Sequence, residues 1–174
     1  MIAKVTRLIA PLAFLALAVA GPAFADDDAT VFIQSVYQTG WDKIASDDTI
    51  RENTLAPGFA KTVASHQALP EEDRVAYDPL AGDKEAGITD VSVELLKETK
   101  TLAKVHVTFK NGGTDSSVDM LLNKTKNGLR INEIVLTDGT KVRQDMAKAV
   151  KQANKADGKS KKPGKKGKKK NKKS

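Results

Sequence analysis

Two tyrosines and two aspartates are the residues of this chain whose side chains could together perform acid–base chemistry. Tyr37 and Tyr77 are the only tyrosines, and Asp78 and Asp83 closely follow the second. An isomerase pairs a carboxylate that removes a proton with a phenol that stabilises the resulting enolate. Tyrosine also packs in cores with its hydroxyl at the rim, and aspartate before proline starts turns. We expect all four to line a ligand site, and we assign no catalytic residue.

Few other residues are suited to catalysis or metal binding. The chain has no cysteine, and its two histidines, His66 and His106, are 40 positions apart. The sequence contains no Gly-x-Ser-x-Gly motif, no glycine-rich phosphate loop and no calcium-loop spacing. We therefore expect no metal and no cofactor. The alternation of apolar residues around His106 predicts a solvent-facing or interface position for that side chain.

Lysine dominates the C-terminal end. Residues 26–154 contain 16 Lys and Arg against 21 Asp and Glu, whereas residues 155–174 contain 11 lysines and one acidic residue. This end has no apolar residue after Ala156, so we expect residues 155–174 to be disordered. Lysine lacks the bidentate fork of arginine, which predicts electrostatic binding to any polyanion and no specific nucleic-acid partner. The expected polyanion-binding residues are Lys159, Lys161, Lys162, Lys165, Lys166, Lys168, Lys169, Lys170, Lys172 and Lys173.

Residues 1–25 have the features of a secretory signal peptide. Lys4 and Arg7 precede an apolar run over residues 8–20, and residues 23–25 read Ala-Phe-Ala, a cleavage site of the Ala-x-Ala type. The apolar run is too short to span a bilayer comfortably, and a chain without cysteine cannot carry a lipoprotein anchor. We expect a periplasmic or secreted protein. The anionic partners in that location are lipopolysaccharide, phospholipid and the cell wall.

Residues 26–154 predict one α+β domain. Apolar residues at helical spacing predict helices over about 29–45, 49–54 and 57–69, followed by an irregular stretch to Gly87. From Ile88 onward the apolar residues alternate instead, which predicts four antiparallel strands joined by turns. A final amphipathic helix is expected over about 140–154. This order predicts a four-stranded antiparallel sheet with helices packed on one face.

Two details of the strands follow from the same alternation. The second strand is the clearest, because Val105 and Val107 alternate with Lys104 and His106. In the fourth strand the apolar positions shift by one residue between Ile131 and Ile134, which predicts a β-bulge.

The order of these elements resembles a family of exported bacterial proteins of unknown function. The residues that carry the resemblance are Ala-Lys-Val-His-Val-Thr-Phe at 103–109 and Gly-Leu-Arg-Ile-Asn-Glu-Ile-Val-Leu-Thr-Asp-Gly-Thr-Lys-Val-Arg at 128–143. That family is related to the cone fold of nuclear transport factor and ketosteroid isomerase. The resemblance covers about residues 30–146 and implies a cone-like sheet. It also implies that Tyr37, Asp78 and Asp83 occupy recurrent positions, and it implies fold more strongly than function.

Two hypotheses about function stay open. In the first, which we favour, the body is a non-catalytic binding module for a protein, a peptide or a small apolar ligand, and the lysine-rich end attaches it to the envelope. In the second, the body is a small-molecule isomerase or hydrolase that uses the carboxylates and tyrosines at the mouth of the cone. We also expect a homodimer formed through the outer sheet face, whose mixed surface comprises Lys104, His106, Thr108, Asp119 and Leu121.

Overall fold

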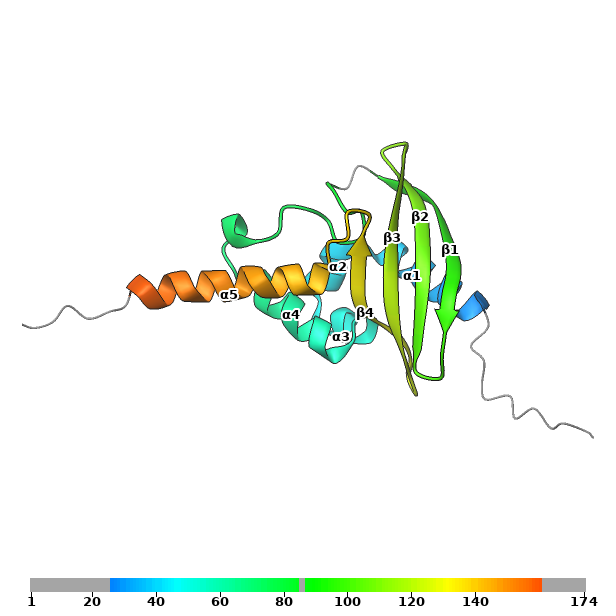
Figure 1. Cartoon of the computed structure of the whole chain (residues 1–174), viewed down its shortest axis with the longest axis horizontal. Helices are drawn as coiled ribbons and strands as arrows, with labels where there is room; N and C mark the ends of the chain where they lie inside the picture. Colours follow the sequence, from blue (N-terminus) through cyan, green and yellow to red (C-terminus); the bar gives the residue numbers. More distant parts are fainter. Residues whose placement is uncertain (1–25, 85–86, 161–174) are drawn as a thin grey trace, which may run out of the picture.

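The computed structural model describes residues 26–84 and 87–160 (Figure 1). Its elements are α1 (Asp26–Thr39), α2 (Trp41–Ser46), α3 (Asp48–Thr54), α4 (Pro57–Gln67), the 3-10 turn η1 (Glu71–Asp73), β1 (Ile88–Glu98), β2 (Leu102–Asn111), β3 (Thr114–Thr125), β4 (Gly128–Leu136) and α5 (Val142–Ser160). The expected signal peptide and residues 161–174 of the lysine-rich end lie outside the described residues.

The four strands form one antiparallel sheet in the order β1-β2-β3-β4. Val107 lies opposite Val118 and Val105 lies opposite Met120 across β2 and β3, and all four side chains are buried. Lys104 and the other residues between them point to the opposite face of the sheet. The register therefore confirms the alternation that the sequence predicts.

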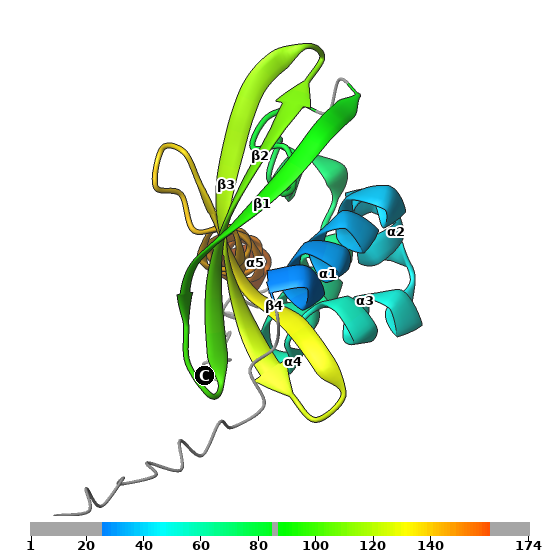
Figure 2. The ribbon, with the colours of Figure 1, turned by 90° about the vertical axis from the view of Figure 1, so that its right-hand side faces the viewer.

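Helices α1 to α4 lie over one face of the twisted sheet, and α5 extends away from its β4 edge (Figures 1 and 2). The hydrophobic core lies between these helices and the inner sheet face, where Ile33, Ile44 and Phe59 are fully buried. Trp41 packs on Phe59, with the ring centroids 6.1 Å apart. The fold is thus α+β with helices on one face, as expected from the sequence.

The helix expected over residues 29–45 is two helices, because Gly40 interrupts it. Gly40 has a φ of 78°, a value that L-residues rarely adopt, and its N–H donates to the carbonyl oxygen of Val36 at 3.0 Å. The chain therefore turns after α1, and α2 begins directly with the buried Trp41. The sequence predicted one continuous helix through this position, since a glycine within a helical pattern can also merely weaken the helix.

The bulge expected in β4 is present at Asn132. Leu121 lies opposite Glu133 and Leu122 lies opposite Ile131, so Asn132 is the extra residue on β4. Because of this insertion, Ile131 before the bulge and Ile134 and Leu136 after it all belong to the core. The other edge of β4 is covered by the segment before α4, whose Ala56 N–H donates to the Ile131 carbonyl oxygen at 2.8 Å.

The C-terminal helix is longer than the sequence predicts. It runs from Val142 to Ser160 rather than ending near Asn154. Val142 and Met146 are fully buried, whereas Lys148, Lys151 and Lys155 are exposed. The first turns of α5 therefore anchor the helix to the body, and its later turns continue into the lysine-rich end.

Candidate functional site

Tyr37 and Asp78 hold the backbone of one buried residue, Leu80. The Tyr37 hydroxyl donates to the Leu80 carbonyl oxygen at 3.0 Å. Asp78 Oδ1 accepts the N–H groups of Leu80 at 2.7 Å and Ala81 at 3.1 Å, which closes the turn that Asp-Pro predicts. Burial, and then the charge of Asp78, raise the pKa of Tyr37. The phenol therefore stays protonated, and its one proton is committed to the loop.

Asp83 lies at the exposed end of the same turn. Its carbonyl oxygen accepts the Asp78 N–H at 3.0 Å, and its Oδ1 accepts the N–H of Lys84 at 2.7 Å. These contacts serve the backbone of the turn. Neither Asp83 nor Tyr37 lines the cavity that Tyr77 and Asp78 border.

Tyr77 reaches a different part of the molecule. Its hydroxyl donates to Asp145 Oδ2 on α5 at 3.1 Å, across 68 positions of sequence. Burial, and then the charge of Asp145, raise the pKa of Tyr77 above its ordinary value. The four residues predicted to share a ligand site thus divide into a turn that holds Leu80 and a contact that ties the loop to α5.

A cavity of about 620 Å³ opens beside Tyr77 and Asp78. Its walls come from α2, from the end of α4 with the segment 71–78 that follows it, from Lys84 and from α5. Trp41, Val75 and Ala76 give it apolar surface, and the carboxylates of Asp42, Glu71 and Glu72 line it as well. An apolar wall with a few convergent polar groups is the usual composition of a small-ligand site. We name this space the loop cavity.

His66 is a buried residue of the loop cavity to which the sequence assigned no role. Its side chain is 2% exposed, and its Nε2 accepts the N–H of Val75 at 2.9 Å. Burial, and then the positive charge of Arg74, lower its pKa, while Asp145 opposes the shift. The imidazole is therefore neutral at pH 7 with its proton on Nδ1, and Nδ1 has no partner within the described structure. The one signal in the sequence was its spacing from Val63, which places both on the inner side of α4.

The Arg74 side chain forms hydrogen bonds with the backbone at the end of α4. Its Nε donates to the Leu69 carbonyl oxygen at 2.9 Å and its Nη2 to the Gln67 carbonyl oxygen at 2.6 Å. Gln67 is the last residue of α4 and Leu69 follows it, so neither carbonyl has an N–H further along the helix to accept. The guanidinium therefore caps α4 and is not a free anion-binding group of the loop cavity.

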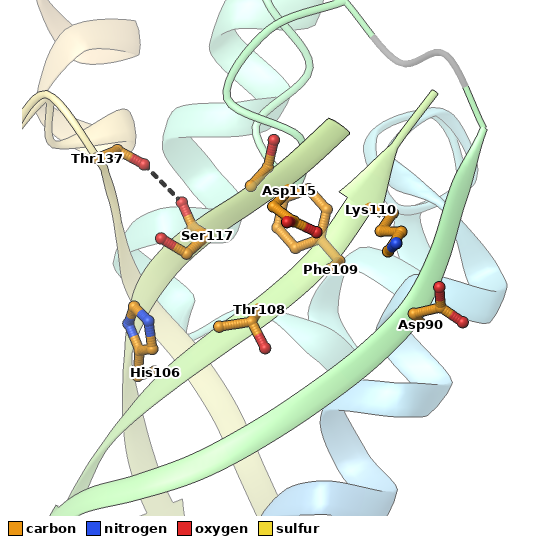
Figure 3. A pocket seen from close by; sticks show the side chains of 9 residues that line it. Asp90, His106, Thr108, Phe109, Lys110, Asp115, Ser117 and Thr137 are labelled. Carbon is orange, nitrogen blue, oxygen red and sulfur yellow. Dashed lines mark hydrogen bonds between the residues drawn. The ribbon is translucent and has the colours of Figure 1, made fainter. Parts of the chain in front are cut away.

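A second hollow, of about 440 Å³, lies on the outer face of the sheet (Figure 3). Three of its hydroxyl residues stand on neighbouring segments, namely Thr108 on β2, Ser117 on β3 and Thr137 after β4. The Thr137 hydroxyl donates to the Ser117 carbonyl oxygen at 2.8 Å. Asp115 and Lys110 extend the polar surface toward the far end of the same strands (Figure 3). This hollow offers a ligand fewer specific contacts than the loop cavity does, because none of its described residues has a buried polar side-chain atom without a hydrogen-bond partner.

His106 lies on this outer face, as the alternation predicts. Its Nδ1 is 2.7 Å from Asp119 Oδ1, and the Lys104 ammonium is 2.7 Å from Asp119 Oδ2. Burial opposes the ionisation of Asp119, but hydrogen bonds from Lys104 and His106 outweigh it and hold the pKa of Asp119 below its usual range. Asp119 therefore joins three residues of the expected dimer surface into one network.

Glu133 is a further buried carboxylate that sequence reasoning missed. It is 4% exposed, and its Oε1 accepts the N–H of Arg143 at 2.8 Å in the first turn of α5. The same oxygen accepts the N–H of Ile134 at 3.2 Å. The N–H groups in the first turn of a helix have no carbonyl partner within the helix, so the Glu133 carboxylate supplies the acceptor that Arg143 lacks. Its negative charge also interacts favourably with the helix dipole. The bulge at Asn132 directs Glu133 toward the start of α5.

The described part of the chain contains neither a cluster of metal ligands nor a helix that could cross a membrane. No three carboxylate, imidazole or thiol groups in residues 26–84 and 87–160 lie close enough together to hold a metal ion. Within the same residues, no helix combines the length and the apolar surface that crossing a membrane requires.

Comparisons with known proteins give little further information. No protein-family model matches the chain, and no curated protein matches it. Among solved structures, the chain is similar to a phospholipid-binding protein from Ralstonia solanacearum determined in complex with a phospholipid. The two are 11% identical, the alignment covers 75% of this chain and 89% of that chain, and the TM-score is 0.41. A likeness at this level carries no argument about the function of this chain.

Proposed function

We propose that this chain is an exported, non-catalytic binding protein whose lysine-rich C-terminal end attaches it to anionic envelope polymers or lipids. The observation that carries the proposal is the separation of charge along the chain. Residues 26–154 have five more acidic than basic residues, and residues 155–174 have ten more basic than acidic ones. A cluster of lysines attracts phosphates and carboxylates of any structure, and salt weakens that attraction.

Helix α5 supports this division into two parts. It has 19 residues, which corresponds to about 28 Å of helix, and it extends away from the sheet (Figure 1). The screening length at physiological salt is about 8 Å. The chain beyond Ser160 therefore begins about 28 Å, more than three screening lengths, from the first turn of α5, where Val142 and Met146 anchor the helix to the body.

The hydrogen bonds of the body favour binding over catalysis. The Tyr37 phenol donates to a backbone carbonyl, Asp78 closes a turn, and the Tyr77 phenol donates to Asp145. A carboxylate that acts as a general base must lie within reach of the proton it removes, next to a group that stabilises the product. Because these side chains are occupied by hydrogen bonds within the body, its proposed role is to bind a ligand. The resemblance to the cone-fold family and the periplasmic or secreted location belong to the same proposal.

Binding to lipid vesicles tests the proposal. We expect the protein without residues 1–25 to bind vesicles that contain anionic phospholipid, with affinity that falls steeply between about 50 and 200 mM salt. Deletion of Lys161–Ser174 leaves α5 complete and should abolish binding without changing the melting temperature. Replacing the lysines of residues 161–174 by arginine is the matched control, because it keeps the charge and should keep the binding.

The same experiment can contradict the proposal in two ways. Binding that does not depend on salt would mean that contacts other than charge hold the protein on the vesicle. A deletion variant that binds as well as the full chain would assign the attachment to the body instead.

A further inference from the structure

The unpaired nitrogen of His66 points to a ligand with a hydrogen-bond acceptor. In the neutral imidazole Nε2 is occupied by the Val75 N–H, so Nδ1 is the donor. This donor is buried and has no acceptor among the described residues, a costly arrangement that native structures rarely keep. His66 lines the loop cavity, so a ligand there lies next to the side chain that carries the missing contact.

The charges around the loop cavity select against an anionic acceptor. The carboxylates of Asp42, Glu71 and Glu72 line it, and none of them forms an ion pair with a described residue. Asp78 adds a fourth carboxylate. The cationic groups facing the same space are Lys84 and Arg74, and the Arg74 guanidinium is held by two carbonyl oxygens of the α4 end. A ligand with an ammonium group and a neutral acceptor fits this balance of charge.

The apolar wall adds a third requirement. Ala76 is exposed and Val75 and Tyr77 are partly exposed, and all three line the loop cavity next to Trp41. An aliphatic stem can pack against such a wall while the charged group at its end stays in water. A peptide carbonyl, an aliphatic stem and an ammonium group occur together in one residue type, lysine.

We propose that the loop cavity binds a lysine residue of a peptide, with His66 Nδ1–H donating to a peptide carbonyl and the carboxylates of Asp42, Glu71 and Glu72 facing the ammonium group. Two sources can supply this residue. One is another protein, and the other is this chain itself, since the 14 residues after Ser160 can extend about 46 Å and η1 packs against α5. This site is separate from the proposed attachment to polyanions.

The test uses Nα-acetyl-lysine amide as the probe and the full chain without residues 1–25. Trp41 is the only tryptophan, so its fluorescence reports directly on the loop cavity. We expect a saturable change in Trp41 fluorescence and a shift of the His66 Nδ1 NMR resonance. Nα-acetyl-norleucine amide keeps the carbonyl and the stem but lacks the ammonium group, so it should bind at least fivefold more weakly.

Variants locate the binding without disturbing the core. Glu71→Gln with Glu72→Gln changes two exposed side chains and should weaken binding of the probe about fivefold. The matched control is Glu52→Gln with Glu94→Gln, which removes the same charge from exposed positions outside the loop cavity. Equal binding by the two variants, or a His66 resonance that does not move at saturating probe, would overturn the proposal.

A second arm separates the two sources of lysine. It repeats the titration in the variant that lacks Lys161–Ser174, and adds a synthetic peptide of that sequence. If the chain supplies its own lysine, the probe binds the deletion variant more tightly than the full chain and the peptide competes with the probe. Equal probe affinity for both forms assigns the lysine to another protein. No saturable response in either form overturns the proposal, and it leaves the vesicle result untouched because that result depends on the C-terminal end alone.

Discussion

The tyrosines of this chain act by donating a hydrogen bond at a place where two segments meet. Tyr37 joins α1 to the buried Leu80, and Tyr77 joins the segment before β1 to α5. Burial raises the pKa of both phenols, so both remain donors over the whole physiological pH range. Their first effect is therefore on the stability of the loop that borders the loop cavity.

Replacing Tyr37 by Phe should lower the free energy of unfolding by about 1 to 2 kcal/mol. The change leaves the buried Leu80 carbonyl oxygen without its Tyr37 donor, which costs more free energy than losing a hydrogen bond at the surface, where water can replace the donor. The matched control is Tyr77→Phe, whose partner Asp145 is only partly buried and can be rehydrated. Urea denaturation measures both variants, and equal losses would contradict the role assigned to Tyr37.

His66 should make stability depend on pH below about 6.5. Its pKa is lower in the folded chain than the ordinary value of 6.5, so between these two values the unfolded chain binds more protons than the folded chain. Stability therefore falls as the pH drops below about 6.5. His66→Gln should reduce this fall in urea titrations, whereas His106→Gln should leave it in place. An unchanged pH profile for His66→Gln would refute the prediction.

At the level of elements, sequence periodicity predicted the strands and turns, which depend on neighbouring residues. It missed the hydrogen bonds between residues that are distant in the sequence. The alternation from Ala103 to Phe109 indicated both the strand and its inner face, because one face of the sheet is buried. The turn at Asp78 was readable for the same local reason. The hydrogen bond from the Tyr37 hydroxyl to the Leu80 carbonyl oxygen in this turn could not be predicted, because the two residues are 43 positions apart in the sequence.

The missed features share this cause. Nothing in the residues around His66 indicates that Val75 will bond its Nε2, and nothing around Glu133 indicates that α5 will start beside it. The break at Gly40 is a different kind of error. A glycine within a helical pattern either weakens the helix or ends it, and only the positive φ distinguishes these outcomes.

A charge on the inner face of β2 should unfold the domain. Val107 is fully buried, so Val107→Asp places a carboxylate in the core without a partner, at a cost of several kcal/mol against a total stability of about 5 to 15. Thr108→Asp is the matched control, because its side chain is exposed on the outer face. Thermal denaturation should show a large loss for the first variant and little change for the second. A normal melting temperature for Val107→Asp would reverse the assigned strand face.

At the scale of the whole molecule, self-association through the outer sheet face stays a prediction. The face presents Leu121 beside the network of Lys104, His106 and Asp119. We expect dimers in sedimentation velocity at micromolar concentration, and Leu121→Lys should dissociate them. Val31→Lys is the control, since Val31 is an exposed apolar residue of α1. A single monomer peak for the unaltered chain would contradict this prediction.

The bulge in β4 has a mechanical consequence at this scale. Glu133, turned by the extra residue Asn132, receives the Arg143 N–H at the root of α5. A helix about 28 Å long acts as a lever, so a tilt of about 10° at its root sweeps the far end through an arc of about 5 Å. Because α4 and η1 also pack against α5, the position at which the chain passes Ser160 depends on these contacts as well as on Asn132, Glu133 and Arg143. Deleting Asn132 removes the bulge and no charged group, and it should change the angle at which α5 leaves the sheet.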